Sequence, residues 1–380
     1  SVRVGFLVDQ MLASVPGGTG RYSAELAAAL VRTARPGEAV VSWCAWRPEA
    51  DMAGAAVPGV LGPIRLPLPR RGLAAAWQRG HGPAPTGVDI VHAPTLLVPP
   101  RRPGVPLVVT IHDAVPWTHA HTLTPHGARW HRRMGVRAAR HADAVIVPTR
   151  AVAAGIRAHL PIPADRLHVI GEGVSEAVGQ VPADAAARAG RLGLPDGGYL
   201  LTLATLEPRK GLDTVLAALR DPAAPDLPLV HVGSPGWGGL DLRVEAARLG
   251  LDPTRLRLLG RLHDADLAVV LSRATALLAP SRSEGFGLPL VEAMAHGVPV
   301  IASDIPAFVE VGGPAIVTVA VGDAAALARA TASVVGDEAL RRRLGTDGRA
   351  RAAAFTWNGA AESVWSLYRR LTGSREFSTG

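Results

Sequence analysis

The chain has 380 residues and a mass of 39.4 kDa, and because one hydrophobic core seldom grows to that size we expect two domains. The formal charge of +8 favours nucleic acid, an anionic membrane or a phosphorylated ligand as partner, although a composition rich in arginine and alanine explains it as well. Cys44 is the only cysteine, which excludes disulfides within the chain and cysteine-based zinc sites.

No apolar run reaches the roughly 18 to 20 residues that a membrane span requires. The first residues lead into an apolar strand pattern without a basic leader. We therefore expect a cytoplasmic protein.

Short apolar runs alternate with segments of helical period through the first half of the chain. The runs predict buried parallel strands at 3–8, 40–46, 89–93, 107–111, 144–147 and 167–170. Helices are predicted between them, as at 21–32 and 129–140. This alternation predicts βαβ units and a doubly wound parallel sheet of the α/β class.

Glycine and proline interrupt this pattern after residue 170, and we predict a connection between domains near 174–195. A second series of strands is predicted at 199–205, 229–233, 256–260, 276–279 and 298–302, followed by a closing helix at 358–371. The predicted domains are 1–178, joined by the closing helix at 358–373, and 179–357.

The strongest motif runs from Glu284 to Glu292, directly after the predicted strand at 276–279. Pro289 suits the first turn of a helix, so Gly285 and Gly287 fall just before a helix N-terminus, where amides and the helix dipole favour phosphate. The two carboxylates can accept hydrogen bonds from sugar and ribose hydroxyls. An ordinary helix start with solvated glutamates is the alternative.

A cationic motif, Glu207-Pro208-Arg209-Lys210-Gly211, follows the first strand of the second domain. It shares the carboxyl edge of that sheet, where open α/β sheets bind ligands. Arg209 supplies a planar fork and Lys210 a point charge, and together they can neutralise a departing diphosphate. A solvated cationic turn is the alternative.

The first domain offers a glycine-rich run, Gly17-Gly18-Thr19-Gly20, before the helix expected from Arg21. Its amides can reach the same phosphates. It is not a dinucleotide fingerprint, because the glycines lie about ten residues after the strand and no acidic residue closes the next strand. A flexible loop is the alternative.

His112 and Asp113 follow the strand that ends at Ile111. This pair is therefore expected at the carboxyl edge of the first sheet, facing the ligand-binding cleft rather than the core. A capped loop histidine is the alternative. Asp264-Ala265-Asp266 resembles a metal-binding Asp-x-Asp, but it falls where a helix N-cap is expected. We expect no metal site.

Together these motifs resemble the retaining family 4 glycosyltransferases, which have the GT-B fold of two Rossmann-like domains facing across a cleft. The resemblance is carried by segments 17–20, 111–113, 204–210 and 284–292 and by the final helix. The form Thr-Leu-Glu-Pro-Arg-Lys at 205–210 is most similar to a mannosyltransferase-like branch. The first domain would bind the acceptor and the second the nucleotide sugar.

The resemblance implies a role for each matching residue. Glu284 would hold hydroxyls of the donor sugar, Glu292 the ribose hydroxyls, and Arg209 with Lys210 the diphosphate. His112 would approach the sugar and the reaction centre, with Asp113 beside it. The remaining donor contacts would come from the backbone of Gly17, Gly18, Thr19, Gly20, Gly285, Phe286, Gly287 and Leu288.

Two segments depart from the family pattern. Ala204 stands where some relatives have arginine or glycine near the phosphates, which leaves the donor open. The turn Gly171-Glu172-Gly173-Val174-Ser175 replaces an Asn-Gly-Val-Asp-like sequence, which leaves the details of the hinge open.

The implied reaction is metal-independent transfer of a hexose with retention, favouring GDP-mannose, to a hydroxyl of a glycolipid, polysaccharide or secondary metabolite. The nucleotide diphosphate sugar is a substrate, and no cofactor is expected. UDP-sugar or dTDP-rhamnose donors and a sugar-nucleotide epimerase are alternatives. So is a basic nucleic-acid-binding protein, although 4% aromatic residues supply few stacking platforms and no nucleic acid partner is expected. The basic segment 126–133, with an embedded tryptophan, suggests peripheral contact with an anionic membrane.

Overall fold

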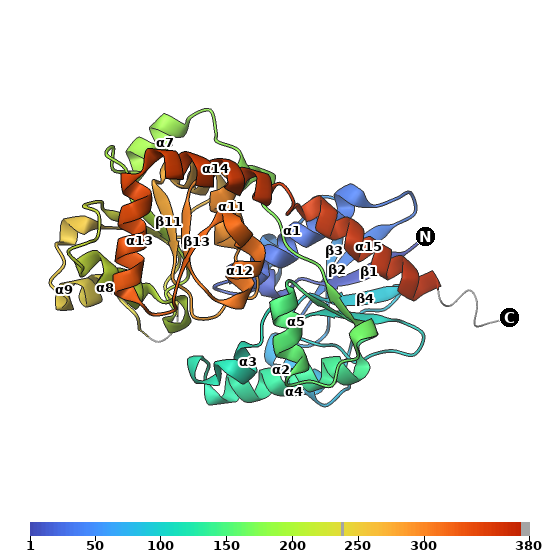
Figure 1. The fold of residues 1–380 in the computed structure, drawn as a ribbon. Coiled ribbons are helices and arrows are strands. Elements are labelled where there is room, and N and C mark those ends of the chain that lie inside the picture. The colour runs from blue at the N-terminus through green and yellow to red at the C-terminus, as the bar shows by residue number, and fades with distance from the viewer. Residues whose placement is uncertain (237–238, 374–380) are drawn as a thin grey trace. The chain divides into compact units, whose positions relative to one another are not determined.

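The computed structural model describes residues 1–236 and 239–373, which form two compact units (Figure 1). The first unit comprises residues 1–172 together with Trp357–Gly373, and the second comprises Gly173–Thr356. The predicted divisions lay at 178/179 and 357/358. Each unit has its own parallel sheet and its own hydrophobic core.

The first unit is built on a seven-stranded parallel sheet in the order β3-β2-β1-β4-β5-β6-β7. The strands are β1 (Arg3–Leu7), β2 (Ala39–Cys44), β3 (Leu61–Arg65), β4 (Ile90–Ala93), β5 (Leu107–Thr110), β6 (Ala144–Val147) and β7 (Leu167–Val169). Its helices are α1 (Gly17–Thr33), α2 (Arg70–Gln78), α3 (Val115–Thr118), α4 (Pro125–His141), α5 (Arg150–Arg157) and α15 (Trp357–Gly373).

The second unit repeats this architecture with a six-stranded sheet in the order β10-β9-β8-β11-β12-β13. The strands are β8 (Leu200–Leu203), β9 (Leu229–Val232), β10 (Leu256–Gly260), β11 (Ala276–Ala279), β12 (Val300–Ser303) and β13 (Val317–Val319). The helices are α6 (Glu176–Gly179), α7 (Ala185–Leu192), α8 (Leu212–Arg220), α9 (Leu242–Arg248), α10 (Asp264–Arg273), α11 (Leu288–Ala295), α12 (Pro306–Gly312), α13 (Ala324–Gly336) and α14 (Glu338–Ala352).

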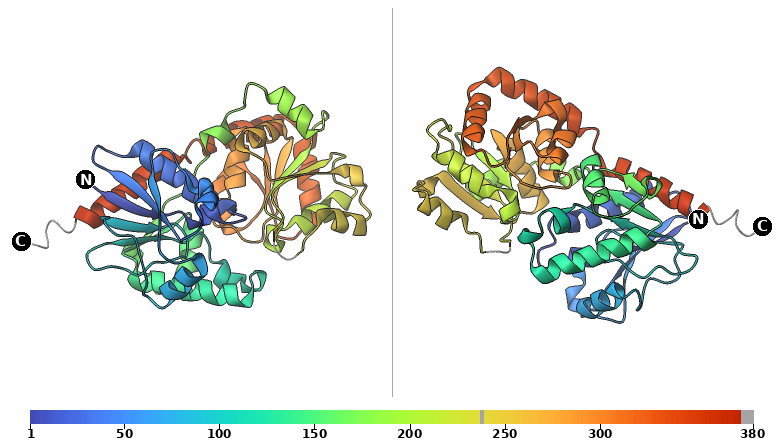
Figure 2. Two further views of the ribbon diagram at one scale, coloured as in Figure 1. Left: turned by 180° about the vertical axis from the view of Figure 1, so that it is seen from behind. Right: turned by 60° about the horizontal axis from the view of Figure 1, so that its bottom comes forward.

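Helices flank both faces of each sheet, as the two further views show (Figure 2). Strands β4, β5 and β6 are accordingly buried at every position, and so are β9, β11 and β12. Strands covered on both faces have continuous runs of apolar residues rather than alternating apolar and polar residues. This is why the sequence pattern predicts two doubly wound parallel sheets, a prediction that the structure confirms.

The eleven predicted strands are all present, but two edge strands were not predicted. Strand β3 contains Gly62 and Pro63 and is largely exposed, and β13 has only three residues. The connection between domains was predicted near 174–195; the units divide at Glu172/Gly173, and α6 and α7 form within the predicted segment. The closing helix is present as α15. None of the helices within 1–236 and 239–373 is long and apolar enough to cross a membrane.

Candidate functional site

Two loops at the carboxyl edge of the second sheet carry the predicted donor site. One loop follows β8 and the other follows β11, and these strands are neighbours where the strand order reverses. Such a switch point is where open α/β sheets form a ligand-binding crevice, because the flanking loops diverge to opposite faces. The cationic motif and the glutamate motif are therefore brought together, as the sequence predicted.

Gly211 permits the close approach of these two loops. It has a φ of +70°, and a Cβ atom on it would lie 2.1 Å from the carbonyl oxygen of Pro280. Only glycine adopts this conformation and leaves this space at little cost. A short 3-10 turn, Pro208–Lys210, precedes it and holds both cations between β8 and α8.

Hydrogen bonds from Arg282 fasten one loop to the other. Its amide donates to the carbonyl oxygen of Arg209 over 2.8 Å, and its guanidinium donates to that of Pro208 over 2.9 Å. The same guanidinium forms a two-pronged ion pair with Asp213, at 2.8 and 3.0 Å. Arg209 in turn donates to the carbonyl oxygen of Ser283 over 3.2 Å. The cationic turn is thus held by the loop that carries Glu284.

Lys210 and Glu284 form an ion pair in which Nζ lies 2.6 Å from Oε1. Ser281 donates to the same carboxylate oxygen over 2.8 Å. Burial raises the pKa of Glu284, but the positive charges of Lys210 and Arg209 and the hydrogen bonds from Lys210 and Ser281 together lower it by more, so the net shift is downward. The carboxylate is therefore ionised at neutral pH and can accept hydrogen bonds from hydroxyl groups.

The N-terminus of α11 lies at the end of the glutamate motif. Gly287 precedes it with a φ of +105°, Pro289 falls in its first turn as predicted, and no side chain caps it. The backbone amides of an uncapped first turn attract anions. Glu292 lies one turn further along α11 and is buried at 6% exposure.

In the first unit, the glycine run Gly17–Gly20 was predicted to precede the helix, but it forms the first turn of that helix. Helix α1 begins at Gly17, four residues earlier than expected, and the amide of Gly20 donates to the carbonyl oxygen of Pro16 over 3.0 Å. A Cβ atom on Gly20 would lie 2.4 Å from Cβ of Pro16, so glycine lets this turn close. No side chain caps the helix, so its first amides can still serve an anion.

His112 follows β5 and is held by three neighbours. Nε2 lies 2.6 Å from the carbonyl oxygen of Pro94, and because a carbonyl only accepts, Nε2 is the donor. The ring of Tyr22 meets the imidazole edge to face, with ring centres 4.6 Å apart. Nδ1 lies 3.8 Å from Oε1 of Glu172. The structure thus surrounds a predicted site residue with two residues, Tyr22 and Glu172, that were not predicted there.

Asp113, the neighbour of His112, accepts a hydrogen bond from the amide of Val115 over 3.0 Å. It therefore shapes the turn into α3. Glu172 lies in the turn that departs from the family pattern, and this departure was the only sign of it in the sequence.

The Asp-x-Asp segment belongs to α10. Asp264 and Asp266 occupy its first turn and His263 the cap position, so the predicted N-cap role was wrong. Asp266 pairs with Arg188 at 2.9 Å. Across the described ranges, no group of three or more His, Cys, Asp or Glu side chains is arranged to hold a metal ion.

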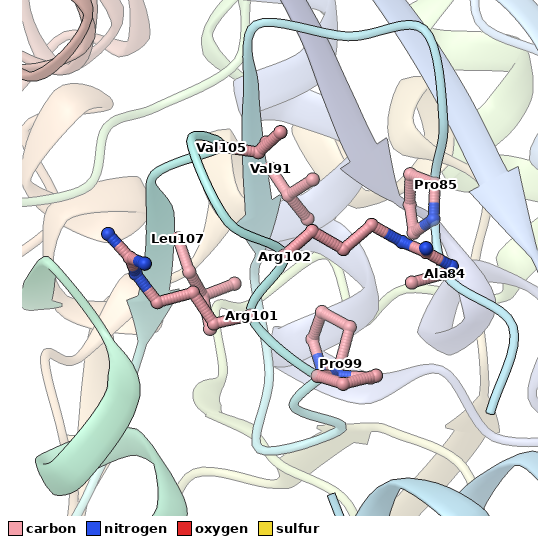
Figure 3. A pocket seen from close by; sticks show the side chains of 9 residues that line it. Ala84, Pro85, Val91, Pro99, Arg101, Arg102, Val105 and Leu107 are labelled. Atoms are coloured by element: carbon pink, nitrogen blue, oxygen red, sulfur yellow. The ribbon is translucent and has the colours of Figure 1, made fainter. Parts of the chain in front are cut away.

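A small pocket lies away from these residues, at the amino edge of the first sheet (Figure 3). It is lined by Val91 of β4, by Leu107 of β5 and by the loops that precede these strands. One of its arginines, Arg101, is paired with Asp143 at 2.9 Å. None of the predicted site residues lines it.

Two family models match the chain, "Glycosyltransferase Family 4" over residues 16–178 and "Glycosyl transferases group 1" over residues 190–351. The D-inositol 3-phosphate glycosyltransferase of Streptomyces scabiei is 32% identical over 333 residues, which cover 80% of this chain and 72% of that protein. The MMP alpha-(1->4)-mannosyltransferase of Mycolicibacterium hassiacum is 30% identical over 307 residues, covering 74% and 70%.

The phosphatidyl-myo-inositol mannosyltransferase of Mycobacterium tuberculosis is 36% identical over 222 residues, which cover 55% of this chain. With this protein and the O-antigen chain mannosyltransferase B of Escherichia coli, the match spans only about half of the relative's length, 57% and 46%.

Solved structures resemble the chain over nearly its whole length. Sucrose-phosphate synthase from Thermosynechococcus elongatus has a TM-score of 0.76 at 24% identity, covering 98% of this chain and 100% of the other. Anabaena HepE in complex with UDP and glucose has a TM-score of 0.75 at 20% identity, covering 97% and 99%. At such identities the likeness establishes the fold.

Proposed function

The chain belongs to glycosyltransferase family 4 and has the GT-B fold, and from this premise we propose that it transfers mannose from GDP-mannose to a hydroxyl acceptor, with retention and without a metal ion. One observation carries the proposal. The loops after β8 and β11 are fastened together so that Arg209, Lys210, Glu284 and the N-terminus of α11 share one edge of the second sheet.

This edge has the chemistry of a diphosphate site. Negative charge grows on the diphosphate as its bond to the sugar breaks, so cations fixed beforehand stabilise the transition state more than the ground state. Arg209 and Lys210 are fixed in this way, by the hydrogen bond to Ser283 and the ion pair with Glu284. They do the work that a divalent cation does in other transferases.

The same edge can hold the donor sugar. Glu284 is ionised and accepts hydrogen bonds from sugar hydroxyls. Because Lys210 lies 2.6 Å from it, a sugar bound to Glu284 has its phosphates beside Lys210. Glu292, one turn along α11 from the phosphate end, accepts the ribose hydroxyls.

Retention follows from attack on the face that the diphosphate leaves. The acceptor oxygen forms a bond to the anomeric carbon as the bond from that carbon to the diphosphate breaks, and the acceptor proton passes to the departing phosphate oxygen. No covalent intermediate on the protein is required. We propose that His112 acts at the reaction centre; its ring is held by Pro94, and Asp113 shapes the turn that carries it.

The choice of mannose rests on the relatives, several of which are named as mannosyltransferases. Their names differ in acceptor, and include phosphatidyl-myo-inositol and D-inositol 3-phosphate. We therefore propose the acceptor only as a class, a hydroxyl of a glycolipid, polysaccharide or secondary metabolite.

A donor screen tests this function. GDP-mannose should raise the melting temperature more than UDP-glucose or dTDP-rhamnose, because a ligand at 100 times its Kd stabilises the folded state by about 2.7 kcal/mol. With an acceptor alcohol present, the products should be GDP and a mannosylated acceptor. Conversion of the sugar nucleotide to an epimer without an acceptor would identify an epimerase instead. Preferential stabilisation by a UDP-sugar would overturn the choice of donor and leave the transferase.

A further inference from the structure

Four polar side chains form a continuous hydrogen-bonded chain inside the first unit. The hydroxyl of Tyr368 lies 2.5 Å from Nδ1 of His92, and Nε2 of His92 lies 2.8 Å from Oγ1 of Thr110. That oxygen lies 3.1 Å from the hydroxyl of Tyr22. All four side chains are at most 2% exposed, so water cannot replace any of these partners.

This series of hydrogen bonds connects four elements of the first unit. Tyr368 belongs to α15, His92 to β4, Thr110 to the end of β5 and Tyr22 to α1. At one end, the ring of Tyr22 packs edge to face against His112, which follows Thr110 by two residues. At the other end, it reaches the helix that the C-terminal part of the sequence contributes to this unit.

Further contacts hold α15 against the same unit. Trp365 donates through its indole nitrogen to the carbonyl oxygen of Leu30 over 2.9 Å. Arg369 binds both carboxylate oxygens of Glu38, at 2.7 and 2.9 Å. Tyr368 therefore sits on a firmly docked helix.

The four hydrogen-bonded side chains depend on one another. Burial, with a smaller contribution from His112, lowers the pKa of His92 to about 3, so His92 is neutral and has one donor and one acceptor nitrogen. Either Tyr368 donates to Nδ1 and Nε2 donates to Thr110, or Thr110 donates to Nε2 and Nδ1 donates to Tyr368. Removing a single hydroxyl leaves a buried nitrogen or oxygen without its partner.

An apolar core would fill this space at a lower desolvation cost, since polar groups are buried favourably only when they are fully paired. The hydrogen-bonded series ends beside His112, whose Nε2 is held by the carbonyl oxygen of Pro94. Resting on the proposed function, in which His112 lies beside the donor sugar, we propose that Tyr368, His92, Thr110 and Tyr22 are positioning residues. Through them, docking of α15 fixes the ring of His112.

Two conservative variants test the proposal, Tyr22→Phe and Tyr368→Phe. Each removes one hydroxyl and keeps the ring. We expect each to lower kcat by about tenfold while the KM for the donor changes by less than about twofold, because orientation at the reaction centre is lost and nucleotide binding is kept. The double variant should lose less than the product of the two effects, because both act through one chain.

Tyr199→Phe is the matched control. Tyr199 is equally buried, at 1% exposure, and its hydroxyl donates to the carbonyl oxygen of Val270 in the second unit. We expect this variant to lower the melting temperature and to keep the kcat of the wild type. If Tyr22→Phe and Tyr368→Phe also keep the kcat of the wild type, their hydroxyls contribute to stability alone and the proposal is wrong.

An NMR measurement separates this inference from the proposed function. With histidines labelled with nitrogen-15, and the His112 signals assigned from His112→Asn, Tyr368→Phe should shift the ring signals of His112 and Tyr199→Phe should not. Unchanged His112 signals in Tyr368→Phe would overturn the positioning chain. A shifted His112 in a protein that transfers sugar from no nucleotide would uphold the chain and reject the function.

Discussion

At the scale of single residues, Arg209 and Lys210 carry the central chemical claim. Each is largely buried, at 21% and 16% exposure, and each already contacts the loop that holds Glu284. Their charges therefore need little rearrangement when the diphosphate leaves. Preorganised charge of this kind is often the largest single contribution to catalysis.

We predict that Arg209→Ala and Lys210→Ala each lower kcat by about two to three decades, since removing one such group costs about 2.7 to 4 kcal/mol at comparable sites. The double variant should lose less than the product, because both cations act on one diphosphate. Arg248→Ala is the control, since Arg248 is 68% exposed and paired with Glu245 in the same unit. Steady-state kinetics check this. A loss confined to KM would mean that both cations only bind the donor.

Glu292 is predicted to act on binding instead. The ribose hydroxyls lie far from the bond that breaks, so Glu292→Ala should raise the KM for the donor by about one to two decades, the range expected for loss of hydrogen bonds to a charged group. Steady-state kinetics with GDP-mannose, beside a melting curve that shows a folded variant, provide the check. An unchanged KM would remove Glu292 from the ribose site.

Residues within one motif were predictable, because their roles depend on local structure. Pro289 at a helix start and Gly287 before it follow from backbone preferences that a short segment reveals. Contacts between distant segments were not predictable. The pairing of Arg282 with Asp213 and the packing of Tyr22 on His112 depend on which strands become neighbours, and no local pattern encodes that.

At the scale of elements, the two loops of the second unit work as one piece because Arg282 fastens them. The Arg282–Asp213 pair is 36% and 62% exposed, so it contributes little to stability. Its effect lies in geometry, because the same guanidinium also holds Pro208 in the cationic turn.

We predict that Arg282→Asp raises the KM for the donor by about tenfold with a nearly unchanged melting temperature. The charge swap Arg282→Asp with Asp213→Arg should recover part of that loss, since it restores the ion pair without the contact to Pro208. Steady-state kinetics of the three variants, with Asp213→Arg alone as the third, decide the matter. KM values equal to that of the wild type in all three variants would show that the loops hold their positions without this pair.

Helix α4 carries the basic surface that suggested membrane contact. Its exposed side chains include Arg129, Arg133 and Arg140, but Trp130 packs against the core of the first unit. The tryptophan is therefore partly covered by the core, and we expect the contact to depend mainly on the arginine charges. We predict that the protein floats with vesicles of anionic lipid at low salt, and not with neutral vesicles or at 1 M salt, where the Debye length falls to about 3 Å. Absence from both vesicle types at low salt would end the membrane proposal.

Element prediction failed where elements are short or exposed. Strand β3 has a proline and four exposed positions, and α6 has only four residues. The start of α1 was misjudged because glycines usually signal a loop, whereas Pro16 and the missing Cβ of Gly20 let the helix begin there. Local propensity is a weak guide when tertiary packing decides the outcome.

At the scale of the whole molecule, the architecture was predictable because period and burial agree over long stretches. Two series of continuous apolar runs, each run followed by a helical segment, leave few topologies other than two doubly wound sheets. The strand order of both sheets comes from the structure, which places the predicted site residues of each unit at a carboxyl edge. The sequence pattern alone did not show how α15 joins the first unit through Tyr368 and Trp365.

The central claim is transfer with retention by fixed cations in place of a metal. It is tested most directly by following GDP-mannose and an acceptor alcohol by proton NMR after treatment with excess EDTA. The account predicts that an α-mannosyl product appears at the rate of the untreated enzyme. A β-linked product, or turnover that stops with EDTA and returns with manganese, would contradict it.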